Sequence, residues 1–106
     1  MNLELDYKGF EEDLMLKKDT SFGGLVGIQY IFRFDNGYGA SVIKSIMSDG
    51  HEHDFWELAV IGFFEDTDRF ELCYGTPVTS NTEGYLTDWE VRNLLKQIKE
   101  LKKGLK

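Results

Sequence analysis

The residues best suited to bind a metal ion lie in one short stretch, where histidines alternate with acidic residues. The stretch is His51-Glu52-His53-Asp54. Imidazole nitrogens and carboxylate oxygens are ordinary ligands for zinc and related ions. The spacing does not match a helical His-Glu-x-x-His motif, so a solvated loop between two strands is the competing interpretation. His51, His53 and Asp54 are therefore the metal-ligating candidates, and we expect no cofactor.

Acid–base chemistry would need a carboxylate in an unusual environment, and one acidic residue lies inside an apolar segment. Glu57 falls within residues 55–64, which are otherwise apolar. If it were buried it would need a cation such as Lys44 or Arg33, and its pKa would shift. The alternative is that Glu57 points to solvent, and the same two alternatives hold for Glu71.

Nucleophilic and phosphate-binding motifs are missing from the sequence. Cys73 is the only cysteine, which excludes an intrachain disulfide and predicts a small core or edge thiol. No serine, threonine or cysteine lies in a nucleophile motif, and no glycine-rich phosphate loop is present. We therefore expect a protein that is not an enzyme.

Acidic residues dominate most of the chain, whereas its last part is basic. The net charge is −7; residues 1–87 hold 16 acids and six bases, and residues 88–106 hold three acids and six bases. Because nucleic-acid phosphates are contacted by lysine and arginine, this balance disfavours direct nucleic-acid binding. It fits a basic protein partner, a surface that mimics nucleic acid, or simple solubility. The acids Glu65, Asp66 and Asp68 are candidates for partner binding.

The hydropathy pattern gives no sign of a membrane partner. No apolar run approaches the roughly 20 residues that cross a bilayer. The first residues lack the basic and apolar regions of a signal peptide. We expect a cytoplasmic location.

The strand pattern is clearest around Asn36-Gly37, which is typical of a two-residue type I′ turn with positive φ at both positions. Period-two alternation precedes it over residues 25–34 and follows it up to residue 47. The predicted cross-strand pairs are Asp35–Tyr38, Phe34–Gly39, Phe32–Ser41, Ile31–Val42 and Tyr30–Ile43. Tyr30, Phe32 and Ile43 would then support a helix, whereas Ile31 and Val42 would share the opposite face.

Two further strands are expected after the hairpin. The third covers about residues 55–64, and the fourth contains Phe70, Leu72 and Tyr74. Residues 76–79 can form only an edge segment or a loop, because Pro77 has no N–H to donate. Residues 1–22 form either an arm or a short strand with a helical turn, and residues 17–21 are expected to be a loop.

The last element carries the signals of a capped amphipathic helix. Thr87 and Glu90 form a capping box, with Leu86 and Val91 placed for a hydrophobic staple. Apolar residues then recur on one face, and lysines gather toward the C-terminal end, where the helix dipole favours them. The predicted helix spans residues 88–103, with Gly104 as its C-cap.

Several strings together resemble a group of small uncharacterised proteins encoded by bacteriophages and prophages. They are Phe22-Gly23-Gly24, Gln29-Tyr30-Ile31-Phe32, Asn36-Gly37-Tyr38-Gly39-Ala40-Ser41-Val42-Ile43, Trp56-Glu57-Leu58-Ala59-Val60, Thr76-Pro77-Val78-Thr79 and Gly84-Tyr85-Leu86-Thr87. The likeness covers about residues 22–101. Two features differ from the group: Gly75 stands where the group has an acidic residue, and the loop before Trp56 is longer and richer in histidine. The resemblance implies a phage context and no known activity.

These observations lead to one architecture and three functional hypotheses. We expect an α+β domain over residues 23–106: an antiparallel meander of four or five strands over residues 24–79, with the C-terminal helix on one face. The face bearing Ile31 and Val42 would be covered by the N-terminal arm or by a second copy in a homodimer. The first hypothesis is a non-enzymatic phage accessory protein that binds a host macromolecule, with inhibition of a host defence system as one version of it. The others are a ligand- or metal-binding module using the His51–Asp54 loop, and a virion component.

Overall fold

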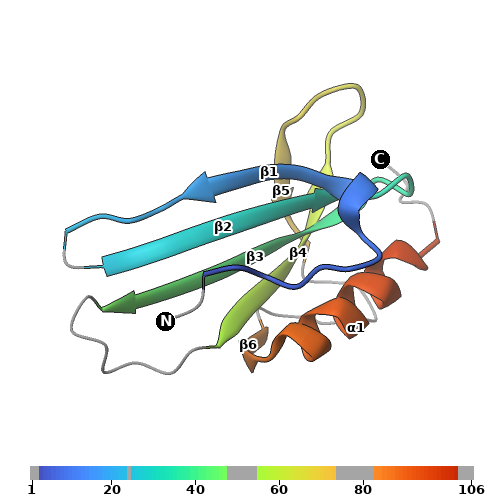
Figure 1. Ribbon diagram of the computed structural model, residues 1–106. Coiled ribbons are helices and arrows are strands. Elements are labelled where there is room, and N and C mark those ends of the chain that lie inside the picture. Colours follow the sequence, from blue (N-terminus) through green and yellow to red (C-terminus); the bar gives the residue numbers. More distant parts are fainter. Residues whose placement is uncertain (1–2, 24, 48–54, 74–82, 103–106) are drawn as a thin grey trace.

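An antiparallel sheet carries the C-terminal helix on one of its faces (Figure 1). The computed structural model describes residues 3–23, 25–47, 55–73 and 83–102. In that part of the chain, the predicted α+β class, a meander sheet with one C-terminal helix, is confirmed. The elements are a 3-10 helix (Glu11–Asp13), β1 (Leu14–Asp19), β2 (Leu25–Arg33), β3 (Tyr38–Met47), β4 (Trp56–Phe63), β5 (Phe70–Leu72), β6 (Glu83–Leu86) and α1 (Asp88–Lys99).

Strands β1 to β5 are neighbours in chain order, and β6 adds to the edge that β5 also uses. β5 pairs with the end of β4, where Ile61 lies opposite Leu72. β6 pairs with its beginning, where Trp56 lies opposite Leu86. Strand β6 was not predicted from the sequence. The predicted edge segment at residues 76–79 lies outside the described residues.

The turn between β2 and β3 differs from the predicted one. Tyr38 O accepts from the Phe34 N–H at 2.8 Å, and Phe34 O accepts from the Gly37 N–H at 3.2 Å. Gly37 has a φ of +88°, whereas Asn36 is not among the described residues with positive φ. The loop therefore has three residues, in the pattern of a type I turn followed by a left-handed glycine. The predicted two-residue type I′ turn was wrong.

One extra loop residue shifts every cross-strand pair. Tyr30 lies opposite Val42, and Ile31 lies opposite Ser41. Because side chains alternate along a strand, this shift turns all of β3 over. Val42 therefore belongs to the helix side and is fully buried, and Ile43, which was predicted to support the helix, lies on the other face. The predicted Ile31–Val42 pair does not form.

The core lies between the sheet and α1. Its fully buried members are Tyr30, Phe32, Ala40, Val42, Trp56, Leu58, Val91, Leu95 and Ile98. Burial of each helix side chain contributes about 1.5–3 kcal/mol. The predicted capping box is confirmed: Thr87 Oγ1 accepts from the Glu90 N–H, and Glu90 Oε1 accepts from the Thr87 N–H at 3.0 Å.

The helix ends at Lys99, four residues earlier than predicted, and the β2–β3 turn lies at that end. The Asn36 side-chain amide donates to the carbonyl oxygens of Ile98 at 2.8 Å and of Leu101 at 3.0 Å. The Ile98 carbonyl belongs to the last turn of α1, where carbonyls have no partner within the helix, and Leu101 follows just after the helix end. Asn36 Oδ1 also accepts from the Tyr38 N–H at 2.9 Å. One side chain therefore fixes the turn and caps the helix, whereas the predicted C-cap, Gly104, lies outside the described residues.

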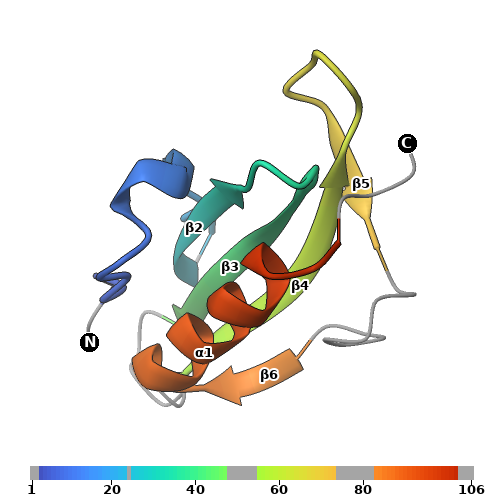
Figure 2. The same cartoon turned by 90° about the vertical axis from the view of Figure 1, so that its right-hand side faces the viewer.

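Residues 3–10 form an arm that covers the same face as α1, beside the helix (Figures 1 and 2). Leu5 is buried, and Leu3, Tyr7 and Phe10 pack against the core. The N-terminal strand is β1, and residues 17–19 belong to it instead of the predicted loop. β1 completes the outer edge of β2 and carries Lys17 and Lys18; charges of this kind discourage further strand addition.

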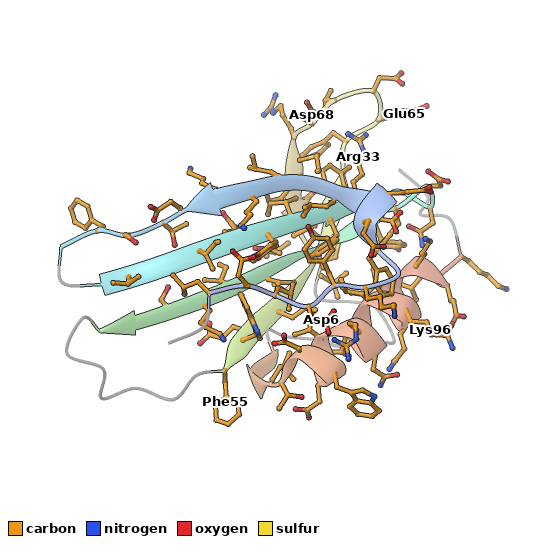
Figure 3. The ribbon with its side chains drawn as sticks, viewed as in Figure 1. Asp6, Arg33, Phe55, Glu65, Asp68 and Lys96 are labelled. Carbon is orange, nitrogen blue, oxygen red and sulfur yellow. The ribbon has the colours of Figure 1, made fainter. Side chains whose placement is uncertain are left out.

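Polar contacts tie the arm to both ends of α1. Asp88 accepts from the Trp56 indole N–H at 2.7 Å and from the Asp6 N–H at 3.0 Å. Arg92 forms a 3.0 Å ion pair with Asp6, which Figure 3 labels beside the helix. Near the other end, the Lys99 ammonium lies 2.9 Å from Asp13 just before β1. That hydrogen bond raises the pKa of Lys99 above its ordinary value. Helix and arm thus cover the core as one layer.

The sheet face away from α1 and the arm is called the open face. It has a small buried cluster of its own, Ile31, Ile61 and Phe63. The Phe63 ring covers Gly39, since a β-carbon added to Gly39 would lie 2.8 Å from a ring carbon. An aromatic ring from β4 therefore shields this glycine.

Candidate partner-binding site

The β4–β5 hairpin extends beyond the end of the sheet, and its turn, residues 64–69, is called the hairpin tip (Figure 2). Hydrogen bonds within residues 64–69 shape the tip, including one from the Phe64 N–H to the Arg69 carbonyl at 2.9 Å. Phe64 O accepts from the Thr67 N–H at 3.1 Å and from the Thr67 hydroxyl at 3.0 Å, and Thr67 Oγ1 accepts from the Arg69 N–H at 3.1 Å. Asp66 has a φ of +60°, a left-handed conformation that aspartate tolerates in turns. The tip is therefore a defined turn.

The three acids predicted to bind a partner lie together on this tip. Glu65, Asp66 and Asp68 are all exposed. Figure 3 shows Glu65 and Asp68 at the outer end of the hairpin, with Arg33 beneath them. The side chain of Asp68 is 88% exposed although it forms an ion pair. The carboxylates therefore face solvent on a projecting turn.

Arg33, at the end of β2, holds the tip in place. This role was not predicted from the sequence. Its guanidinium donates to the Thr67 carbonyl at 2.7 Å and lies 3.1 Å from Asp68 Oδ1. It also stacks on the Phe63 ring, 4.5 Å from the centroid. An exposed ion pair contributes at most about 1 kcal/mol, so the main effect of Arg33 is to fix where the tip sits. The signal that could have revealed it is an arginine at a strand end, beside an acidic turn.

The structure does not bring the two apolar candidates to this site. Ile31 is 1% exposed within the cluster of the open face. Val42 is fully buried beneath α1, on the opposite face of the sheet. Neither side chain presents a contact surface in the structure. Exposed aromatic area near the tip comes instead from Phe64 and Phe70, which are 41% and 39% exposed.

The metal-ligating candidates His51, His53 and Asp54 lie outside the described residues. Within residues 3–23, 25–47, 55–73 and 83–102, no group of three metal-ligating side chains is found. The hypothesis of a metal site in this loop is therefore neither supported nor contradicted by the geometry.

The candidate carboxylate Glu57 is exposed on the open face, in agreement with the solvent-facing alternative, and Glu71 is exposed as well. The buried charge is instead Lys44, which is 3% exposed with its ammonium 4.3 Å from the centroid of the Trp56 ring. Cys73 is half-buried and packs against the core, as expected. No acid–base pair is assembled around Glu57 among the described side chains.

The arm carries a shallow depression. It has a volume of about 260 Å³ and is lined by Leu5, Asp6, Tyr7, Lys8 and Glu11. It opens widely to solvent, unlike the enclosed apolar pockets that hold small ligands.

In the described chain, no helix has both the length and the apolar composition to span a membrane.

Comparisons with protein-family models, with curated proteins and with solved structures found no match for this chain.

Proposed function

We propose that this chain is a non-enzymatic phage or prophage accessory protein that binds a basic surface of a host protein inside the host cell. The observation that carries the proposal is the hairpin tip. Three exposed carboxylates stand on a projecting turn, beside the half-exposed rings of Phe64 and Phe70. Charged rims with aromatic neighbours are common features of protein interfaces. The phage context comes from the sequence resemblance.

Two properties of the tip favour binding. Its backbone is held by internal hydrogen bonds and by Arg33, so little conformational entropy is lost when a partner docks. Its three carboxylates outnumber the two arginines on or beside it, Arg33 and Arg69, so a basic partner would meet a net negative charge there. Such a charge mainly raises the association rate, and the gain falls as salt is added.

The test compares two variants with the same net charge. The tip variant carries Glu65→Lys and Asp66→Asn, which leaves the Asp68–Arg33 ion pair in place. The control carries Glu12→Lys and Glu100→Gln, at exposed positions away from the tip. The net charge of both variants rises by three. At such exposed positions substitutions usually change stability by no more than about 0.5 kcal/mol.

Each protein is used to capture partners from a lysate of the bacterial host, and bound proteins are quantified by mass spectrometry. We expect one basic host protein to be enriched by the natural sequence and by the control, and at least about tenfold less by the tip variant. Its recovery should also fall as the salt concentration rises. Equal recovery with the tip variant and the natural sequence would refute the assignment of the tip.

A further inference from the structure

The register of β1 to β4 aligns four open-face side chains in a row across the sheet. The cross-strand pairs Lys18–Gln29, Gln29–Ile43 and Ile43–Glu57 connect them. The row begins with an exposed cation on β1 and ends with an exposed anion on β4. With strands about 4.8 Å apart, the two charged residues are separated by roughly 14 Å.

The next row toward the hairpin tip is apolar or small. It consists of Leu16, Ile31, Ser41 and Ala59, which are also cross-strand partners. Leu16 is 45% exposed, Ala59 is half-buried and Ile31 is buried. The two rows together form a strip with a positive end and a negative end.

We propose that this strip is the interface of a homodimer in which two open faces pack together. A two-fold axis parallel to the strands, between β2 and β3, places β1 of one protomer over β4 of its partner. Lys18 then meets Glu57 of the partner subunit, and the same ion pair forms a second time by symmetry. In the adjacent row, Leu16 meets Ala59 of the partner subunit, a large side chain against a small one.

Self-complementarity is the argument for a second copy as the occupant. A two-fold interface uses the same patch on both subunits, so its charges must pair after rotation. Among the described residues, neither Lys18 nor Glu57 has an ion-pair partner within its own chain. Aligned packing of two twisted sheets, at about 30°, is also an ordinary arrangement.

The strip is small, so the dimer should be weak and reversible. Two rows of four residues cover roughly 14 by 7 Å between α-carbons, well below the roughly 800 Å² per partner of a standard stable interface. We expect a dissociation constant in the micromolar range or weaker. Sedimentation velocity from about 5 μM to about 500 μM should therefore show a monomer–dimer equilibrium in the natural protein.

Charge reversal tests the pairing directly. Lys18→Glu or Glu57→Lys alone sets like charges against each other at both symmetric contacts, and should weaken the dimer at least about tenfold. An equimolar mixture of the two variants restores both ion pairs, so it should form a heterodimer. Lys96→Glu on the exposed side of α1 is the matched control for Lys18→Glu and should leave the dimer unchanged.

Recovery of dimer in the mixture would also show that both variants are folded. A natural protein that remains monomeric over the whole concentration range would overturn the proposal. So would a dimer that neither reversal weakens, because it would have to use another surface, such as the free edge of β1. A mixture that stays monomeric while the natural protein dimerises would equally refute the Lys18–Glu57 contact.

Discussion

Removal of a single buried hydroxyl should loosen the arm that covers the core beside α1. The Tyr30 hydroxyl accepts from the Leu5 N–H at 3.2 Å and donates to the Leu3 carbonyl at 3.1 Å. The Tyr30 side chain has no exposed surface, and Leu5 is 4% exposed. Tyr30→Phe would leave the Leu5 N–H buried without its partner, whereas the half-buried Leu3 carbonyl can turn to water. We expect a loss of about 2 kcal/mol in the free energy of unfolding.

Urea unfolding, monitored by circular dichroism, measures this loss. The slope of the free energy of unfolding against urea concentration should stay unchanged. The midpoint of thermal unfolding should fall by roughly 10 °C. Hydrogen exchange adds local evidence, since the Leu5 amide should exchange faster than in the natural protein. Tyr7→Phe is the control: the Tyr7 ring packs on Tyr30 and Phe32, but its hydroxyl makes no hydrogen bond to another described residue.

An equally small change in the free energy of unfolding for Tyr30→Phe and Tyr7→Phe would refute this role of the Tyr30 hydroxyl. That result would mean that the arm is not held by the Tyr30 hydroxyl in solution. A large loss of stability with unchanged exchange at Leu5 would point to the core, and it would also contradict the mechanism.

Three further predictions follow from contacts of single residues. Gly39→Ala should destabilise the protein by about 2 kcal/mol or more in urea unfolding, because the added β-carbon would overlap a carbonyl of β2. Gly84→Ala on β6 is the control and should leave the free energy of unfolding nearly unchanged. Asn36→Ala should cost about 1–2 kcal/mol by chemical denaturation and speed amide exchange in the last turn of α1, since the carbonyls of Ile98 and Leu101 each lose one hydrogen bond. The Asp13 hydrogen bond raises the pKa of Lys99, so the stability that it contributes is complete below the ordinary pKa of 10.5 and is lost as the pH rises through the raised pKa. In Asp13→Asn this hydrogen bond to a carboxylate is gone. An NMR titration should therefore give a lower pKa for Lys99 in Asp13→Asn than in the natural protein.

The sequence predicted those elements whose signals are local. The capping box of α1 and the alternation of β2 to β4 each depend on residues within one turn or one strand, and both are present in the structure. Strand β1 could not be found in this way. Lys17, Lys18 and Asp19 are typical of a loop, and they form a strand because the outer edge of β2 accepts them. Pairing with an edge is a tertiary effect that overrides local preference.

The β2–β3 turn shows how much depends on one residue. Asn36 was interpreted as a residue that tolerates positive φ, yet its side chain is used to bind carbonyls at the end of α1, more than 60 positions away. Only the glycine adopts positive φ, and the loop gains a residue. The loop length therefore determines which side chains of β3 face α1 and which lie on the open face. The acidic tip was predictable because it depends on composition, whereas the open face was not, because it depends on register.

The two proposals combine through the direction of the two-fold axis. A rotation about an axis parallel to the strands leaves each end of one sheet over the same end of the other. Both hairpin tips, which extend from the same end of β4 in each protomer, would then point the same way on opposite sides of the dimer. A host surface with two basic patches, or two copies of a basic host protein, could be engaged by both tips at once. Binding through two tips raises the effective concentration of the second contact without any new interaction. Lys18→Glu should therefore weaken partner binding even though it leaves the tip untouched, and the mixture with Glu57→Lys should restore it.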